Sequence, residues 1–332
     1  MPEHIDTHDH RLWHNNLLTV RNRILKTLKD NNIDVVKKNV LFNAWDESIH
    51  NCPVAIINYD DVIWDSSFMG DLVKTAKKYN IKFTLITNVF YNNTLKNEWY
   101  NVVFIKELFG VFYNPNITQI QSQPAKLYTC LMQRTTFPRL KLFAELSRNK
   151  LLNNSNVSLR GMQTGEHNLS ANGVAESINN NFGGFDDIIS QYDFPYSNFR
   201  EKDNCYEIEE QSKYVIVSET YNDHANMEWI SFTEKTFRSL QIPNISLILN
   251  KKGAKEVLDS IGIKTHPINY ILDRMITYDS QTDFIIGVLT ADMFDLEESN
   301  SMATHNQQQL EEWNSTLGTD RFYQSIVDLM HA

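Results

Sequence analysis

The feature that most constrains the fold of this chain is the alternation of strand-like and helix-like segments between Tyr214 and Ile263. Val215 to Ser218 is a short apolar, β-branched segment, as is Ile245 to Leu249, and both predict buried strands. Between them, Thr233 is a favourable N-cap residue for a helix. Strands that alternate with helices form parallel sheets, so this stretch predicts an α/β fold.

The same alternation extends over the rest of the chain. We expect strands at 40–44, 54–58, 83–87, 102–105 and 126–132, helices at 17–31, 68–79, 138–146, 254–261, 284–294 and 307–330, an extended segment at 267–272 and an acidic link at 295–306. A length of 332 residues suits two domains. We therefore predict a Rossmann-like domain over 1–123, a second domain over 124–305, and a C-terminal helix over 306–332.

Composition excludes several classes of protein. The chain has only 11 glycines and contains neither a G-x-G-x-x-G nor a Walker sequence, which argues against a dinucleotide oxidoreductase and a P-loop enzyme. Cys52, Cys130 and Cys205 are too widely spaced for a disulfide framework or a CxxC zinc site, and they suit a reducing compartment. A net charge of −10 argues against general adhesion to nucleic acid. We expect a cytoplasmic protein, in the host cytoplasm if it is virus-encoded.

We expect neither a membrane-spanning segment nor a metal site. No apolar segment reaches the 18 or so residues that would span a membrane. The N-terminal segment combines histidines and aspartates in a density that can bind metal, namely His4, Asp6, His8, Asp9, His10 and His14. Such a polar composition is also typical of a chain terminus, and we predict no metal site.

Two cations lie where helices are expected to begin. Lys235 follows Glu234 in the first turn after Thr233, and Arg139 follows Pro138, a residue favoured at a helix start. A cation there is poorly placed unless it faces an anion, so both positions indicate a phosphate site, with solvated surface residues as the alternative. Glu219 ends a predicted strand, at the sheet edge where α/β proteins bind ligands.

The order Glu219, Thr233-Glu234-Lys235, Pro243 and Gly262 resembles the donor-binding signature of the α-1,3-fucosyltransferase family, including its viral and phage-encoded relatives. The resemblance covers about 126–262. It implies a GT-B type fold, in which two Rossmann-like domains face a cleft and the C-terminal helix returns to the first domain.

The same resemblance implies roles for the individual residues of the donor site. Glu234 would contact the ribose of a nucleotide, and Lys235 and Arg139 its diphosphate, with Arg134 as a second candidate. Thr220 stands where the family has Asn, so Thr220 or Asn222 would take that contact. The full expected donor-binding set is Arg134, Arg139, Glu219, Thr220, Asn222, Thr233, Glu234 and Lys235.

The implied activity is transfer of a sugar from a nucleotide-diphosphate sugar to an acceptor hydroxyl of a glycan, with inversion at the sugar carbon. No Asp-x-Asp triplet occurs, so we expect neither a metal nor a cofactor beyond the co-substrate. A carboxylate of the first domain would take the acceptor proton. Asp60 and Asp61, just after 54–58, are the first candidates, although aspartates are also ordinary turn residues; Asp46 and Glu47 are the next candidates.

Two other functions stay open. A phage-type DNA glycosyltransferase would modify a hydroxymethylated cytosine base and would need a positive groove on DNA. The candidates for that groove are Lys74, Lys77, Lys78, Lys82, Lys96 and Lys106. A non-catalytic nucleotide-sugar-binding protein would use the same donor site without turnover.

Overall fold

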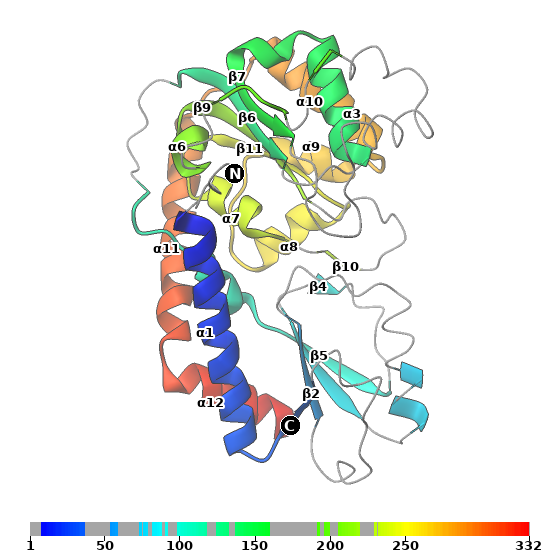
Figure 1. The fold of residues 1–332 in the computed structure, drawn as a ribbon, viewed down its shortest axis with the longest axis vertical. Helices are drawn as coiled ribbons and strands as arrows, with labels where there is room; N and C mark the ends of the chain where they lie inside the picture. The colour runs from blue at the N-terminus through cyan, green and yellow to red at the C-terminus, as the bar shows by residue number, and fades with distance from the viewer. Residues whose placement is uncertain are drawn as a thin grey trace, which may run out of the picture. The chain divides into compact units, whose positions relative to one another are not determined.

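The protein is an α/β protein whose described residues form two compact units (Figure 1). The computed structural model describes residues 8–36, 54–58, 73–74, 76–78, 82–87, 90–91, 98–117, 124–132, 137–159, 191–192, 196–199, 205–219, 229–230 and 232–331. Unit 1 consists of the described parts of Asn114–Ala225 and Glu234–Gln307. Unit 2 consists of the described parts of His8–Tyr113, Asn226–Thr233 and Gln308–Ala332.

The sheet of unit 1 has the strand order β11-β9-β6-β7-β8. Its strands are β6 (Lys126–Met132), β7 (Ser155–Leu159), β8 (Tyr196–Ser197), β9 (Ser212–Ser218) and β11 (Ile245–Leu249). All pair in parallel except β8, which is antiparallel to β7. The predicted strands at 126–132 and 245–249 are confirmed with the same bounds.

The side of the sheet on which new strands are added changes between β6 and β9. After β6 it adds β7 and β8 on one side, and it then returns to add β9 and β11 on the other side. This is the doubly wound order, and the carboxyl ends of β6 and β9 form its topological switch point. Ligands of open α/β sheets bind at such a point, so a ligand site is expected beside the carboxyl ends of β6 and β9.

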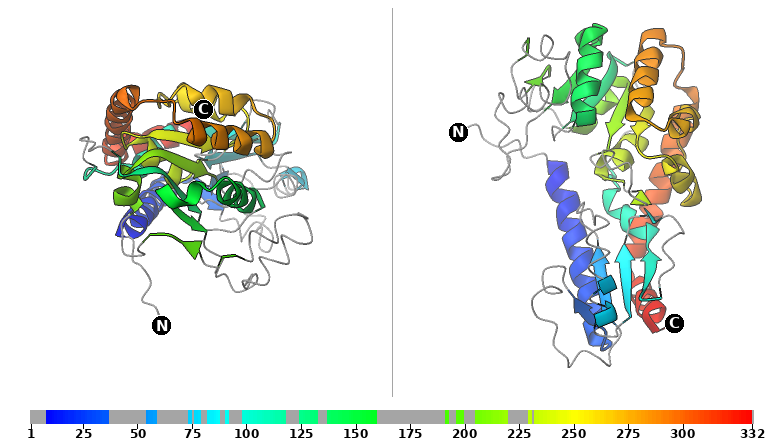
Figure 2. Two further views of the ribbon diagram at one scale, coloured as in Figure 1. Left: turned by 90° about the horizontal axis from the view of Figure 1, so that it is seen from above. Right: turned by 90° about the vertical axis from the view of Figure 1, so that its right-hand side faces the viewer.

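Helices pack on both faces of the unit 1 sheet. They are α3 (Phe137–Arg148), α6 (Cys205–Glu210), α7 (Glu234–Leu240), α8 (Ala254–Ser260), α9 (Ile268–Arg274) and α10 (Tyr278–Ala291). Helices α3 and α10 lie side by side (Figure 2) and form an apolar core with Tyr128, Cys130 and Tyr214 of the sheet. Thr129 points to the opposite face, where its hydroxyl donates to the Ile208 carbonyl of α6 at 3.1 Å.

Unit 2 contains a four-stranded parallel sheet of order β1-β2-β3-β5. Its strands are β1 (Asp34–Val36), β2 (Val54–Asn58), β3 (Phe83–Thr87) and β5 (Tyr100–Phe104). The predictions at 54–58 and 83–87 are confirmed, and the one at 102–105 is displaced by two residues at its start and by one at its end. The strand predicted at 40–44 lies outside the described residues. Separately, β4 (Phe90–Tyr91) pairs with β10 (Trp229–Ile230) in antiparallel fashion.

The end of the chain belongs to unit 2 together with the N-terminal helix. Helix α1 (His8–Asp30) packs against α12 (Asp320–His331), β1 and the 3-10 helix η3 (Lys106–Phe112). Arg23 of α1 donates to the Gly318 carbonyl at 3.2 Å and to Asp320 at 2.6 Å. These contacts place α12 on the first helix of the chain.

Three predictions in the last third of the chain were wrong. Residues 267–272, expected to be extended, form most of α9, and the acidic link expected at 295–306 is largely the first half of α11 (Glu297–Leu317). The single helix expected at 307–330 is two helices that meet near Gly318. Tertiary contacts explain α11, because Ala303 and Asn306 on its polar sequence are buried and the Asn306 amide donates to the Leu240 and Lys264 carbonyls.

Candidate functional site

Arg139 contacts the end of β9 at the switch point. It lies in the first turn of α3, the helix that follows β6, and it is fully buried. Its Nη2 atom donates to the carbonyl oxygen of Ser218, the last residue of β9, at 2.5 Å. The alternative of a solvated surface arginine is therefore wrong for Arg139.

Glu219 lies directly after β9 and is also buried. Its backbone N–H donates to the Leu249 carbonyl of β11 at 3.3 Å, and its Oε1 atom accepts a hydrogen bond from the Thr236 hydroxyl at 2.5 Å. Because Thr236 belongs to α7, this bond holds the helix start near the carboxyl ends of the strands. Arg139 thus contacts Ser218, and Glu219 is the next residue along the chain.

Glu234 and Lys235 are the first two residues of α7 and pair with each other. The Lys235 ammonium donates to Glu234 Oε1 at 3.1 Å, and both side chains are largely buried. Burial alone would raise the pKa of Glu234, but the charges of Lys235 and Arg238 outweigh it and lower that pKa to about 2. Glu234 is therefore an ionised acceptor at neutral pH.

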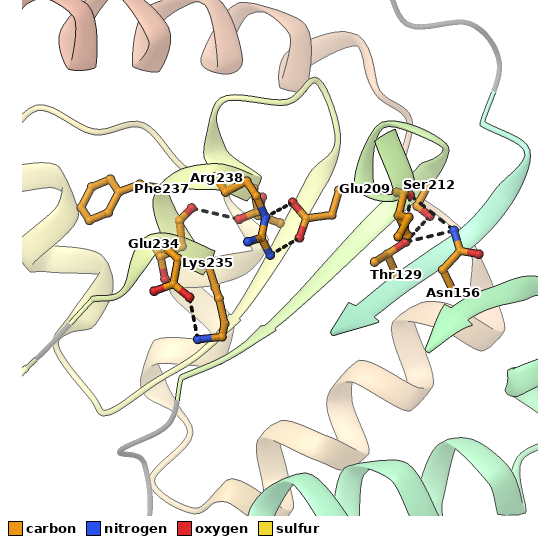
Figure 3. A network of polar contacts seen from close by, with 12 residues as sticks. Thr129, Asn156, Glu209, Ser212, Glu234, Lys235, Phe237 and Arg238 are labelled. Atoms are coloured by element: carbon orange, nitrogen blue, oxygen red, sulfur yellow. Dashed lines mark hydrogen bonds and ion pairs between the residues drawn. The ribbon is translucent and has the colours of Figure 1, made fainter. Parts of the chain in front are cut away.

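A second ion pair lies beside the first, between α6 and α7 (Figure 3). Arg238 donates from Nε to Glu209 Oε2 at 2.9 Å and from Nη2 to Glu209 Oε1 at 2.6 Å, which is a bidentate arrangement. Burial disfavours the charged guanidinium, yet the Glu209 carboxylate outweighs that effect and raises the pKa of Arg238. The two pairs form a cluster of two cations and two anions with no net charge, which we call the charge cluster.

Further polar groups lie at the carboxyl ends of β9 and β11. The Ser218 and Tyr278 hydroxyls are 3.2 Å apart. Asn250, just after β11, is buried, and its side-chain oxygen accepts from the Lys251 backbone N–H at 2.7 Å. The Lys251 side chain is partly exposed, and burial lowers its pKa to about 8.

The predicted donor residues fall at different places in the structure. Arg139 and Glu219 lie at the switch point, whereas Glu234 and Lys235 belong to the charge cluster. Thr233 is buried immediately before α7. The remaining predicted site residues lie outside the described part of the chain, namely Arg134, Thr220 and Asn222 of the donor set and Asp46, Glu47, Asp60 and Asp61 of the base candidates.

The sequence did not point to several polar residues of this region: Thr236, Arg238, Glu209, Tyr278 and Lys251. One available signal was the spacing of Glu234 and Arg238, since a Glu four residues before an Arg in a helix can pair with it. Glu209 and Tyr278 are brought in by the tertiary fold and carry no local signal.

The described residues provide three further facts, about metal-ligating groups, membrane-spanning helices and the lysines considered for a DNA groove. Among them, no group of three or more His, Cys, Asp or Glu side chains is arranged to hold a metal ion. The N-terminal histidines fall outside the side chains that the structure describes. No described helix has the length and apolar character that crossing a membrane requires. Lys74, Lys77, Lys78, Lys82 and Lys106 are exposed, and Lys96 is not described.

Comparison with protein-family models and with curated proteins found no match for this chain.

Proposed function

We propose that this protein is a GT-B type glycosyltransferase that binds a nucleotide-diphosphate sugar at the carboxyl ends of β6 and β9. The observation that carries the proposal is the buried Arg139 guanidinium, which extends from the first turn of the helix after β6 and donates to the Ser218 carbonyl at the end of β9, at the switch point of a doubly wound sheet. A guanidinium suits a diphosphate because its N–H groups match pairs of phosphate oxygens. The position therefore combines the usual ligand edge of the fold with the cation that a diphosphate needs.

The nucleoside part of the donor would use the carboxylates of the same region. Ribose hydroxyls are hydrogen-bond donors, and an ionised carboxylate is a pure acceptor. Glu234 meets this requirement, because its pKa of about 2 keeps it ionised throughout the physiological range. Lys235 is held by Glu234, so in this proposal it keeps that carboxylate charged as well as adding positive charge for the phosphates.

The proposed reaction is a single displacement. The acceptor oxygen attacks the anomeric carbon of the sugar, the bond from that carbon to the diphosphate oxygen breaks, and the configuration inverts. Arg139 would stabilise the negative charge that develops on the departing nucleoside diphosphate. The proton of the acceptor hydroxyl passes to a carboxylate, for which Asp60, Asp61, Asp46 and Glu47 stay the candidates.

A ligand screen tests the donor site. The protein is heated with each common nucleoside diphosphate, each corresponding nucleotide sugar and each nucleoside. We expect one nucleoside diphosphate and its sugars to stabilise the fold, by about 2.7 kcal/mol when the ligand is at a hundredfold excess over its dissociation constant. The nucleoside alone should stabilise it much less. If no member of the panel shifts the melting temperature at millimolar concentration, the proposed function is wrong.

Turnover then identifies the acceptor. The stabilising nucleotide sugar is incubated with glycans and with DNA duplexes that contain cytosine or hydroxymethylcytosine, and the products are weighed by mass spectrometry. A mass increase of one sugar on a glycan supports the proposed activity. An increase only on hydroxymethylated DNA supports the DNA-modifying alternative. Binding of the donor without any transfer or hydrolysis would indicate a nucleotide-sugar-binding protein that is not an enzyme.

A further inference from the structure

The hydroxyl of Tyr278 lies at the carboxyl end of β9. It is 3.2 Å from the hydroxyl of Ser218, the last residue of that strand. The carbonyl oxygen of the same Ser218 accepts the hydrogen bond from Arg139 Nη2. The Tyr278 hydroxyl and the Arg139 guanidinium therefore contact one residue, the first through its side chain and the second through its backbone. A ligand group bound by Arg139 at this end of β9 would lie close to the Tyr278 hydroxyl.

Packing of the ring holds the Tyr278 side chain in place. The ring is partly buried and packs against the apolar core that α3 and α10 form with the sheet. A tyrosine side chain has only two χ angles, so a packed ring leaves the hydroxyl little freedom to move. Tyrosine suits such a position, because its ring is apolar while its hydroxyl can make hydrogen bonds at the edge of the core.

The first turn of α10 is tied to α3, to α9 and to the end of β11. Gln281 in this turn donates to the Asn250 carbonyl just after β11 at 3.0 Å, and to the Leu272 carbonyl of α9 at 3.2 Å. Asp279 pairs with Lys141 of α3 at 2.5 Å. These contacts fix the backbone from which the tyrosine side chain extends. The hydroxyl is thus preorganised at the end of β9, as a binding group needs to be.

We propose that the Tyr278 hydroxyl donates a hydrogen bond to the diphosphate of the nucleotide sugar, beside Arg139. This inference rests on the proposed function and deepens it, because it names a second binding residue and places the diphosphate against the start of α10. A phenol hydroxyl both donates and accepts, so it can accept from Ser218 while its own proton faces a phosphate oxygen. A neutral donor suits this position, because it binds the anion without placing a second cation beside the buried guanidinium.

Tyrosine variants test the inference. The change is Tyr278→Phe, which removes the hydroxyl and keeps the ring. The matched control is Tyr270→Phe in α9, where the lost hydroxyl donates to Asp259 at 2.8 Å. The probes are the nucleoside diphosphate that stabilises the wild type and its nucleoside, with affinities measured by calorimetry. We expect Tyr278→Phe to bind the diphosphate about tenfold more weakly and the nucleoside as tightly as the wild type, because the lost bond is to a charged acceptor.

The outcomes separate the inference from the function on which it rests. Equal affinities of Tyr278→Phe and Tyr270→Phe for the nucleoside diphosphate overturn the role of Tyr278 and leave the donor site intact. An equal loss of affinity for diphosphate and nucleoside in Tyr278→Phe also overturns it, because the hydroxyl would then support the structure of the site without contacting the diphosphate. If the wild type binds no nucleoside diphosphate, the proposed function fails and this inference falls with it.

Discussion

The charge of Lys235 is already balanced inside the protein. From the sequence, a lysine in the first turn of a helix suggested an external anion, since cations are unfavourable there. In the structure Glu234 accepts from that lysine, and the neighbouring Arg238 and Glu209 form a second pair. An internal carboxylate thus takes the place that was predicted for a phosphate, so Lys235 by itself is weaker support for a donor site than Arg139.

Replacing Lys235 should disturb Glu234 in a measurable way. In Lys235→Met the carboxylate stays largely buried and loses its nearest cation, so its pKa should rise from about 2. A carboxyl-detected NMR titration of wild type and variant measures this pKa directly. Lys252→Met, which changes an exposed lysine, should leave the Glu234 pKa where it is. An unchanged pKa in Lys235→Met would mean that Arg238 alone keeps Glu234 ionised.

The same pair makes stability depend on pH. The pKa of Glu234 is lowered by folding, so its ionisation stabilises the fold fully above the unfolded value of 4.5, and this contribution is lost as the pH falls toward about 2. Lys235→Met should therefore cost about 1–3 kcal/mol at pH 7 and progressively less at acid pH. Urea denaturation at a series of pH values between 7 and 3 checks this, and a loss of stability that is independent of pH would contradict it.

At the scale of elements, the Glu209–Arg238 pair joins α6 to α7. Arg238→Met leaves a buried carboxylate without its bidentate partner, which should cost about 3–5 kcal/mol. The double change Glu209→Met with Arg238→Met removes both charges and should be less destabilising than Arg238→Met alone. Equilibrium urea denaturation of the wild type, Glu209→Met, Arg238→Met and the double variant gives the coupling energy. A double variant less stable than Arg238→Met would contradict this prediction, because the Glu209 side chain would then stabilise the fold even without Arg238.

Strands were predicted well where local sequence decides them. Segments such as 126–132, 83–87 and 245–249 consist largely of apolar and β-branched or aromatic residues, a composition that favours buried strands. Residues 267–272 carry a similar apolar composition, yet they form α9, because a tertiary contact decides their conformation. The partners of Arg139 and Glu219, and the charge cluster around Lys235, could not be predicted from the sequence for the same reason. These groups come together only in the folded protein.

Asn269 makes the tertiary contact that accompanies a helix, and not the expected extended segment, at 267–272. Its side-chain amide donates to the Ser246 carbonyl at 2.8 Å and its oxygen accepts the Ile248 N–H at 3.0 Å, so a helix residue makes the hydrogen bonds that a neighbouring strand would make. Asn269→Leu would leave two buried backbone groups of β11 without these partners and should cost about 2–4 kcal/mol. Ile271→Ser, at an exposed position of the same helix, should change stability by less than about 0.5 kcal/mol. Chemical denaturation of both variants provides the comparison.

At the scale of the whole molecule, each unit is assembled from segments far apart in the sequence. Unit 2 combines the described parts of His8–Tyr113 and Asn226–Thr233 with those of Gln308–Ala332, and α11 contributes residues to both units. Phe109 of η3 packs against Trp313 of α11, with ring centroids 6.4 Å apart. The C-terminal segment therefore contributes buried side chains to unit 2, and we expect the stability of this unit to depend on it.

Gly110 makes this dependence testable, because its backbone meets that of α11 within unit 2. A Cβ atom at Gly110 would lie 2.4 Å from the Asn314 nitrogen and 2.6 Å from the Trp313 carbonyl carbon, neither of which can rotate away. Gly110→Ala should therefore separate η3 from α11 and destabilise unit 2 by about 1–3 kcal/mol. Gly287→Ala is the control in unit 1: it meets nothing within 4 Å and lies in α10, so the alanine should stabilise that helix by about 0.5–1 kcal/mol.

Hydrogen exchange separates the two effects, since it reports on each unit by itself. In Gly110→Ala, peptides from α1 and α12 should exchange faster, because α1 packs on both η3 and α12. Peptides from β6 and β9 of unit 1 should keep their wild-type protection. Loss of protection throughout the chain would instead show that the two units unfold as one cooperative body, and the C-terminal segment would then stabilise the proposed donor site as well as unit 2.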